Sequence, residues 1–131
     1  MTELVQIDSS RKQRYRDSRL EVEFHTQAAV VDGKLVELTN LEYRLLAMLA
    51  ENAGEVVPRA SLLMTVWGYG PNIRTRTLDV HIRRLRSKLG NTGRQQIETI
   101  FGIGYRLQPW SDRSAPPVVT QDSASFGLSA A

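Results

Sequence analysis

The richest set of side chains able to do chemistry lies in residues 74–89, RTRTLDVHIRRLRSKL. At about 100° per residue, an α-helix over this segment puts its leucine and isoleucine side chains on one narrow stripe. The opposite side then carries Arg76, Val80, Arg83 and Arg84. Guanidinium groups pair with phosphates, and one guanidinium can pair with both acceptors of a guanine base. Val80 lies away from the stripe, so the core does not require an apolar side chain there. In the major groove of DNA, such a side chain could pack against the methyl group of thymine.

Positive charge is concentrated on this segment. The formal net charge of the chain is only +3. Residues 20–73 hold three Lys/Arg against seven Asp/Glu, a balance of −4, whereas residues 74–89 hold six against Asp79 alone, a balance of +5. Such a concentration is the electrostatic footprint of a nucleic-acid contact. A solvated surface helix would carry similar charges, so charge alone leaves both interpretations open.

Other kinds of chemistry find no support in the sequence. The absence of cysteine excludes a disulfide framework, a thiolate nucleophile and a zinc site with sulfur ligands. The two histidines, His25 and His81, are far apart in sequence and have no metal-ligand spacing. No Ser/His/Asp or paired-carboxylate arrangement stands out, and no helix start follows Gly102-Ile103-Gly104 to make a phosphate cradle. We therefore expect no enzymatic activity, no metal and no cofactor.

Signals for a membrane or for export are also missing. The chain has no apolar run of about 18 residues, the length that a transmembrane helix needs. Its start, MTELVQIDSS, lacks the basic and then apolar pattern of a signal peptide. We therefore expect a cytoplasmic protein without a membrane partner.

The N-terminal part of the chain predicts a small antiparallel sheet. Residues 1–19 are polar without apolar periodicity, which is typical of a flexible arm or linker. Residues 20–24 alternate between apolar and acidic types, and residues 28–31 form a second apolar run. Asp32-Gly33 is a two-residue hairpin signal, because both turn positions favour a positive φ, and it precedes a third strand over residues 34–38.

Two helices are predicted before the basic one. Thr39 and Glu42 form a capping box that starts the first helix, which runs to about Asn52 and is closed by Gly54 in a left-handed conformation. Pro58 suits the first position of the second helix, where its missing N–H does no harm. The glycines and the proline of residues 68–72 require a loop, and residues 90–93 (GNTG) stop the basic helix.

A hairpin follows the basic helix. Residues 97–100 and 105–107 are predicted strands on either side of a glycine-containing tip. From residue 108 to residue 131 the chain is mostly Pro-, Ser- and Ala-rich, which predicts a largely disordered tail, with Trp110 docked on the domain as one option. The order of strands, helix, helix, loop, basic helix and hairpin is the plan of a winged helix-turn-helix. We therefore predict an α+β fold over residues 20–107, with an N-terminal antiparallel sheet, three helices and a C-terminal β-hairpin wing.

The sequence resembles the effector domain of OmpR/PhoB-type response regulators, which are bacterial winged-helix transcription factors. The matching segments are residues 35–39 (LVELT), 41–46 (LEYRLL), 62–68 (LLMTVWG), 76–86 (RTLDVHIRRLR) and 99–107 (TIFGIGYRL). The resemblance implies a four-stranded N-terminal sheet, double-stranded DNA with direct-repeat sites as the partner, and head-to-tail pairs on that DNA. It also implies that the loop before the basic helix touches RNA polymerase; here that loop is Gly68, Tyr69, Gly70, Pro71, Asn72, Ile73 and Arg74.

The resemblance also supplies the candidate contacts to DNA. Arg84 is the strongest candidate for a base contact, whereas Arg83 either pairs with Asp79 or contacts a phosphate, and Arg86 lies close enough to the buried stripe to be structural. His81 lies between the two faces of the helix and is either a phosphate donor or a packed surface residue. The expected DNA-binding residues are Trp67, Arg76, Thr77, Val80, His81, Arg83, Arg84, Arg86, Thr99, Phe101 and Tyr105.

Two residues depart from the family pattern. Phe101 occupies the wing position where several relatives carry an arginine that enters the minor groove. Its ring has three roles open: packing against sugars, wedging into a base step, or supporting the wing tip. We expect weaker minor-groove reading and a lower salt dependence than an arginine would give. Pro58 replaces the usual capping serine of the second helix, which changes capping and not chemistry.

The receiver domain of the family would need about 120 residues, and only 19 precede the predicted sheet. The chain is therefore expected to be either an excised effector domain or a free-standing regulator. A sequence-specific transcriptional regulator is the leading hypothesis. The alternatives are a winged-helix module that binds an acidic protein partner and a non-specific nucleic-acid binder.

Overall fold

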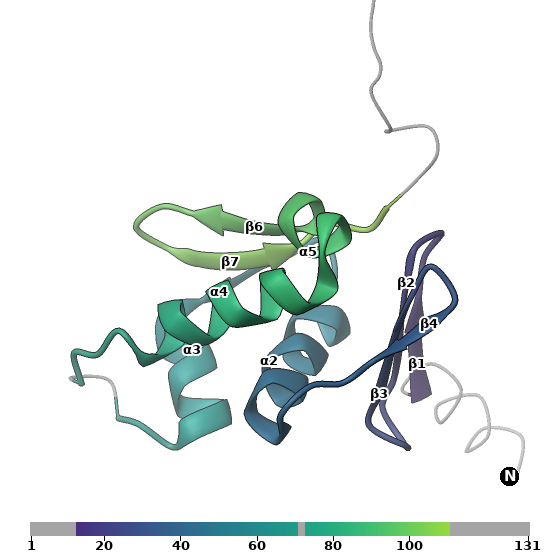
Figure 1. The fold of residues 1–131 in the computed structure, drawn as a ribbon. Coiled ribbons are helices and arrows are strands. Elements are labelled where there is room, and N and C mark those ends of the chain that lie inside the picture. The colour runs from purple at the N-terminus through teal and green to yellow at the C-terminus, as the bar shows by residue number, and fades with distance from the viewer. Residues whose placement is uncertain (1–12, 71–72, 111–131) are drawn as a thin grey trace, which may run out of the picture.

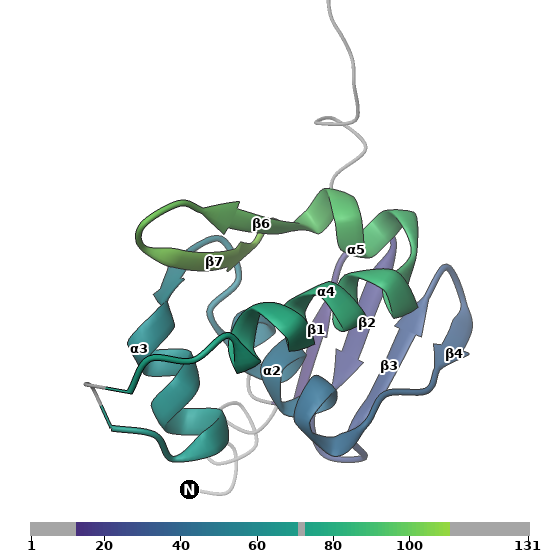
Figure 2. The same cartoon turned by 60° about the vertical axis from the view of Figure 1, so that its left-hand side comes forward.

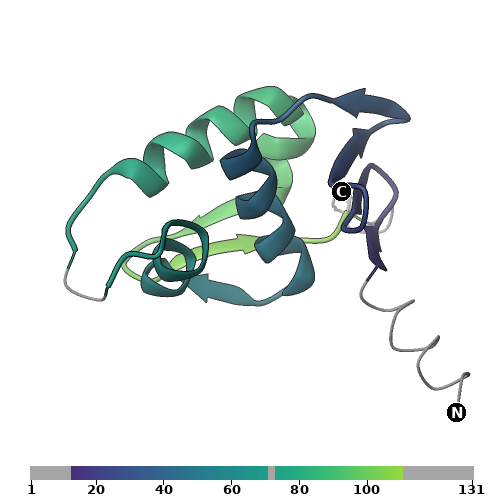
Figure 3. The same ribbon diagram turned by 90° about the horizontal axis from the view of Figure 1, so that it is seen from below.

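The computed structural model describes residues 13–70 and 73–110, and over them the chain has the predicted α+β winged-helix architecture (Figure 1). The elements are, in order, β1 (Arg14–Arg16), β2 (Leu20–Glu23), β3 (Ala28–Val31), β4 (Lys34–Val36), α2 (Asn40–Glu51), β5 (Val56–Pro58), α3 (Arg59–Leu62), the π-helical turn η1 (Leu63–Trp67), α4 (Thr77–Leu89), α5 (Asn91–Gln96), β6 (Ile97–Ile100) and β7 (Gly104–Leu107). Seen from below, α2 lies in the middle, with the N-terminal sheet at one end and the loop before α4 at the other (Figure 3). None of the helices in the described ranges is both long enough and apolar enough to cross a bilayer.

The N-terminal sheet has four antiparallel strands in the order β1-β2-β3-β4. The alternation predicted for β2 is present, because Leu20 and Val22 are buried while the glutamates between and after them are only half-buried. Asp32 and Gly33 have φ values of 50° and 83°, as the two central residues of a tight hairpin turn require. The sheet therefore packs one face against the helices and leaves the other to solvent.

Strand β1 corrects the prediction that residues 1–19 form a flexible arm. Tyr15 lies opposite Val22 in the ladder, and Arg14 donates to Glu21 across it over 3.2 Å. The carboxylate of Asp17 then accepts the backbone N–H groups of Arg19 and Leu20, each over 2.8 Å. The strand is an Arg-Tyr-Arg edge held by cross-strand charge and hydrogen bonding. It has no apolar periodicity for a sequence pattern to detect.

Asp17 also meets the far end of the described chain. Its carboxylate accepts the side-chain N–H of Gln96 at 2.7 Å and the backbone N–H of Trp110 at 3.0 Å. The Arg19 guanidinium lies 4.5 Å from the centre of the Trp110 ring, within cation–π range. Trp110 is therefore docked on the domain, which corrects the prediction of disorder for residues 108–110. The remaining tail, like most of the predicted arm, lies outside the described residues.

Helix α2 begins at the predicted capping box. The Glu42 amide donates to Thr39 Oγ1 over 3.2 Å, and the Thr39 amide donates to Glu42 Oε1 over 2.9 Å. Lys88 also donates to this Oε1 over 2.7 Å, and the Glu42 residue is only 2% exposed. The carboxylate that caps α2 therefore also ties α2 to the end of α4.

The start of the second helix differs from the prediction. Pro58 is not its first helical residue: it ends β5 in an extended conformation (φ −63°, ψ 150°), and α3 begins at Arg59. Strand β5 pairs with β7, so the wing belongs to a three-stranded sheet in the order β5-β7-β6. A Cβ on Gly104 would lie 2.0 Å from the carbonyl oxygen of Val57, so the close approach of these strands requires glycine.

Helix α4 shows the predicted buried stripe, made by Leu78, Ile82, Leu85 and Leu89. It starts at Thr77, three residues later than predicted, and ends at Leu89. Gly90, with a φ of 70°, turns the chain into an additional short helix, α5, so the prediction of three helices was incomplete. Gly93 packs so tightly on α4 that an added Cβ would lie 2.7 Å from the Arg86 carbonyl oxygen.

Candidate nucleic-acid interface

The outward face of α4 carries the positive charge. Because the leucine and isoleucine stripe is buried, the helix must turn its other side to solvent, and Arg76, Arg83 and Arg84 are exposed there. Thr77 and Val80 lie half-buried on the same helix. In the part of the chain that the structure describes, no carboxylate pairs with these three arginines. The alternative in which Arg83 pairs with Asp79 is therefore wrong.

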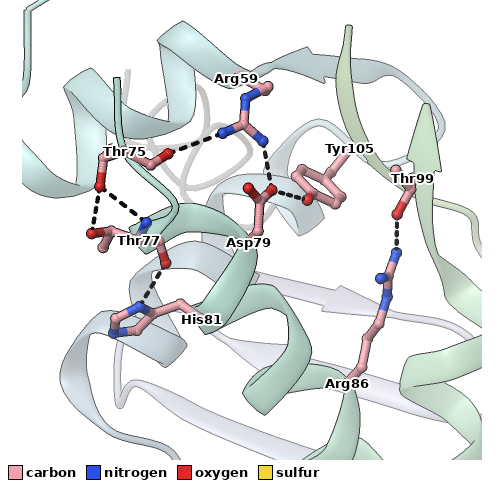
Figure 4. Close-up of polar contacts among 8 residues, drawn as sticks. All are labelled: Arg59, Thr75, Thr77, Asp79, His81, Arg86, Thr99 and Tyr105. Atoms are coloured by element: carbon pink, nitrogen blue, oxygen red, sulfur yellow. Dashed lines mark hydrogen bonds and ion pairs between the residues drawn. The ribbon is translucent and has the colours of Figure 1, made fainter. Parts of the chain in front are cut away.

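Asp79 pairs with two other elements instead. Its Oδ1 accepts from Arg59 Nη1 at 2.6 Å and from the Tyr105 hydroxyl at 2.5 Å (Figure 4). Burial acts to raise the pKa of the Asp79 carboxyl, but the hydrogen bonds from Arg59 and Tyr105 outweigh it and hold that pKa below its usual value. Burial and the bond to Asp79 raise the pKa of Tyr105 to about 12. One carboxylate thus joins the second helix, the basic helix and the wing.

Arg86 faces the wing and not solvent. Its Nε and Nη2 donate to the Ile97 carbonyl at 3.0 and 2.8 Å. Nη2 also donates to Thr99 Oγ1 at 2.8 Å (Figure 4). The guanidinium lies 5.7 Å from the centre of the Tyr105 ring, and Tyr105 is buried. Arg86, Thr99 and Tyr105 were all expected at the DNA interface. The structure gives their polar groups partners within the domain.

The first turn of α4 is organised by threonines and an aromatic pair. Thr75 Oγ1 accepts the Thr77 amide at 3.1 Å, and the two threonine hydroxyls are 2.8 Å apart. His81 Nδ1 donates to the Thr77 carbonyl at 2.9 Å, so Nδ1 carries a proton. The Trp67 ring, half-buried against the core, meets the His81 ring edge-on with centroids 5.1 Å apart. His81 is therefore a packed residue at the margin of the exposed face.

The wing tip projects into solvent beside α4. Phe101 is 89% exposed, so its ring does not support the tip, which removes one of its three predicted roles. A groove of about 380 Å³ separates α4 from the wing, and its lining includes Arg59, Arg83, Arg86, Thr99 and Phe101. Figures 1 and 2 both show α4 running alongside the β6–β7 hairpin. A basic groove flanked by a helix and a hairpin suits the phosphate backbone of a duplex.

The loop between η1 and α4 was predicted to touch RNA polymerase. Gly68 begins it with a φ of 78°, and Tyr69 packs against the core. Ile73 is 50% exposed and Arg74 is also exposed, while Pro71 and Asn72 lie outside the described residues. The described part of the loop therefore offers one apolar and one basic side chain to solvent.

Sequence reasoning missed two supports of this interface. Arg59 lies 20 residues before Asp79, and no periodicity of α4 could indicate that they meet. Glu42 was recognised as a capping residue, but its bond to Lys88, 46 residues later, carried no local signal. Thr75 did carry a signal, because a threonine just ahead of an amphipathic segment favours bonding to a helical amide.

Comparison with known proteins gives consistent results. Residues 33–107 match the family model described as "Transcriptional regulatory protein, C terminal". The response regulator ArlR of Staphylococcus aureus is 46% identical over 79 residues, which are 60% of this chain and 36% of ArlR. The chain thus spans about a third of the length of that relative.

Solved structures show the same fold. The DNA-binding domain of CpxR from E. coli superposes with a TM-score of 0.67 at 32% identity, over 75% of this chain and 98% of that one. The Klebsiella pneumoniae RstA DNA-binding domain, solved in complex with the RstA box, gives a TM-score of 0.68 at 28% identity, over 75% of this chain and 99% of that one. The similarity therefore covers nearly the whole length of the two solved domains and three quarters of this chain.

Proposed function

Because this chain belongs to the family of C-terminal domains of transcriptional regulatory proteins, we propose that it binds double-stranded DNA in a sequence-specific way, with α4 in the major groove. The observation that carries the proposal is the exposed face of α4, where three arginines stand without a carboxylate partner among the described residues. The major groove is about 12 Å wide and admits an α-helix. The relative RstA, a structural neighbour, was solved with its DNA box.

The exposed residues divide by the contact each suits. Arg84 is exposed on the outward face and suits a paired contact with guanine in the groove. Arg76 and Arg83 are exposed as well, and Arg83 also lines the groove beside the wing, so both suit phosphates. Thr77 and Val80 face base edges. The position of the wing relative to α4 is set by Arg86, Thr99 and Tyr105. The start of the helix is supported by His81 and Trp67.

A wider regulatory role extends this proposal. We infer that the chain is the effector domain of a two-component response regulator or of a receiver-less relative, which binds direct repeats as a head-to-tail pair. The loop with Ile73 and Arg74 would contact RNA polymerase. The relation to ArlR and the exposure of these two side chains support this extension.

Fluorescence anisotropy tests the proposal. Binding is measured across a range of salt concentrations, with a duplex that the protein selects from a random pool and with a scrambled version of that duplex. Arg84→Ala should remove most of the preference for the selected duplex, because a bidentate base contact contributes about 1–3 kcal/mol of discrimination. Arg16→Ala, at the exposed edge strand β1, is the matched control and should leave the preference intact. Equal losses in both variants would indicate non-specific binding, and no binding at low salt would exclude DNA as the partner.

A further inference from the structure

The tip of the wing is an apolar projection. Residues 100–104 are Ile-Phe-Gly-Ile-Gly, and none of them is charged. Phe101 is 89% exposed and Ile103 is 53% exposed. The tip is a closed turn, because the Ile103 amide donates to the Ile100 carbonyl at 2.9 Å and Gly102 adopts a φ of 80°. Phe101 and Ile103 thus form one small exposed apolar surface on this turn, which is available to bind a partner.

The tip is also stiff. The Arg59 amide donates to the Ile103 carbonyl at 3.0 Å, which anchors the tip to the start of α3. Arg86 anchors the β6 strand of the wing to α4 through Ile97 and Thr99. The pairing of β7 with β5 fixes the other strand. The turn that carries Phe101 is therefore held by hydrogen bonds from both α3 and α4, so the position of the ring relative to α4 is fixed.

The position of the tip relative to α4 defines what it can reach. Phe101 and Arg83 line the same groove, one from the wing and the other from the helix. With α4 in the major groove and a phosphate backbone in the groove between them, the tip lies over the adjacent minor groove. That groove is about 6 Å wide. The stacked faces of neighbouring base pairs, which an apolar side chain can reach from this groove, are apolar.

We propose, on the basis of the DNA-binding function above, that Phe101 inserts its ring from the minor groove into a base step beside the major-groove site, with Ile103 packed on the neighbouring sugar. Apolar side chains that enter a step in this way unstack it and bend the duplex by about 20–90° toward the major groove. Pyrimidine–purine steps such as TA and CA/TG unstack most readily. The protein therefore selects a deformable step in the flank of its site, in addition to the bases that α4 reads.

The test uses the full chain and the duplex it selects, with 2-aminopurine placed in turn at each flanking step and with donor and acceptor dyes at the two ends. The wild-type protein should raise 2-aminopurine fluorescence at one flanking step and shorten the end-to-end distance. Phe101→Ala should abolish both signals and weaken binding about three- to tenfold, with sequence preference retained. Phe101→Leu should keep most of both signals, because leucine also acts as a wedge.

Leu35→Ala is the matched control, because Leu35 is also a large apolar side chain exposed to solvent, at 70%, but lies on the N-terminal sheet. It should change neither signal. Specific binding with no unstacking, or Phe101→Ala binding with both signals intact, would overturn the wedge while leaving the DNA-binding function in place. Weaker binding by Phe101→Ala with unchanged signals would also overturn it, since the ring would then only pack against sugars. Absence of specific binding by the wild type would overturn both proposals.

Discussion

The arginines of α4 differ in their environment because each occupies a different angle around the helix. Arg83 and Arg84 are exposed, whereas Arg86, two residues further on, turns against the wing and donates to the Ile97 carbonyl and to Thr99. The guanidinium of Arg86 supplies several donors in a fixed plane, which suits this bracing role better than a lysine would. Replacing Arg86 would therefore disturb the wing before it removed any contact to a phosphate.

The variant Phe101→Arg tests how the absence of charge at the wing tip affects DNA binding. If the tip lies over the minor groove as proposed, an arginine at this 89% exposed position adds a cation close to the phosphates that flank the groove. Affinity for the selected duplex should rise at low salt, and the slope of log affinity against log salt concentration should steepen by about 1. Anisotropy titrations at four or more salt concentrations measure both quantities. Unchanged affinity at every salt concentration would show that the tip does not approach DNA.

Residue roles that depend on one helix were predictable from the sequence, and those that depend on two elements were not. The helical wheel of α4 placed Arg84 outward and Arg86 near the buried stripe, and both positions agree with the structure. Arg83, one turn away, was one of two predicted possibilities for a partner of Asp79, but the partners are Arg59 from another helix and Tyr105. Sequence periodicity describes neighbours on one helix and carries no information about which distant side chain completes a pair.

At the scale of elements, local signals located the longer pieces of the fold. The capping box at Thr39, the Asp32-Gly33 turn and the stripe of α4 each involve residues within a few positions of one another. The short elements β1, β5 and α5 had no such signal. Strand β5, for example, exists because three residues find a ladder partner in β7, about 50 residues later along the chain.

The β5–β7 contact predicts a strong effect of Gly104→Ala. The added Cβ would lie 2.0 Å from the Val57 carbonyl oxygen, so the strands must separate and the wing loses its third strand. We expect the free energy of unfolding to fall by about 1–3 kcal/mol in urea titrations, as in other overpacked sites. Gly70→Ala is the control, since Gly70 has open space at its Cβ and no positive φ. Equal stability of the two variants would show that β5 and β7 separate without cost.

At the scale of the whole molecule, the Glu42–Lys88 pair links the start of α2 to the end of α4. Burial acts to raise the pKa of the Glu42 carboxyl, but the hydrogen bond from Lys88 and the Thr39 amide outweigh it, and the pKa lies below its ordinary value of 4.5. The unfolded chain therefore binds a proton at a higher pH than the folded one. The stabilisation is complete above about pH 4.5 and is lost as pH falls through the folded-state pKa.

Glu42→Gln tests this linkage. The variant should be less stable than the wild type by about 1–3 kcal/mol at pH 7, because the buried charge-assisted bond is lost. The difference should shrink as pH falls below about 4.5, where the carboxyl of the unfolded wild type takes up a proton, and should be smallest below the folded-state pKa. Thermal unfolding from pH 3 to pH 7 measures the difference, with the exposed Glu37→Gln as control. A difference that does not depend on pH would show that Glu42 acts through packing alone.

The three-way junction at Asp79 has a consequence for how the preferred DNA sequence can change during evolution. Because one carboxylate fixes the second helix, the basic helix and the wing together, the framework does not depend on the identity of the residues that face outward. If α4 reads DNA as proposed, exchanges at Val80 and Arg84 should change the preferred DNA sequence with little effect on folding, because neither side chain takes part in this junction. The residues that hold the fold together and the residues proposed to read DNA are therefore separate sets, and substitutions can accumulate in one set without changing the other.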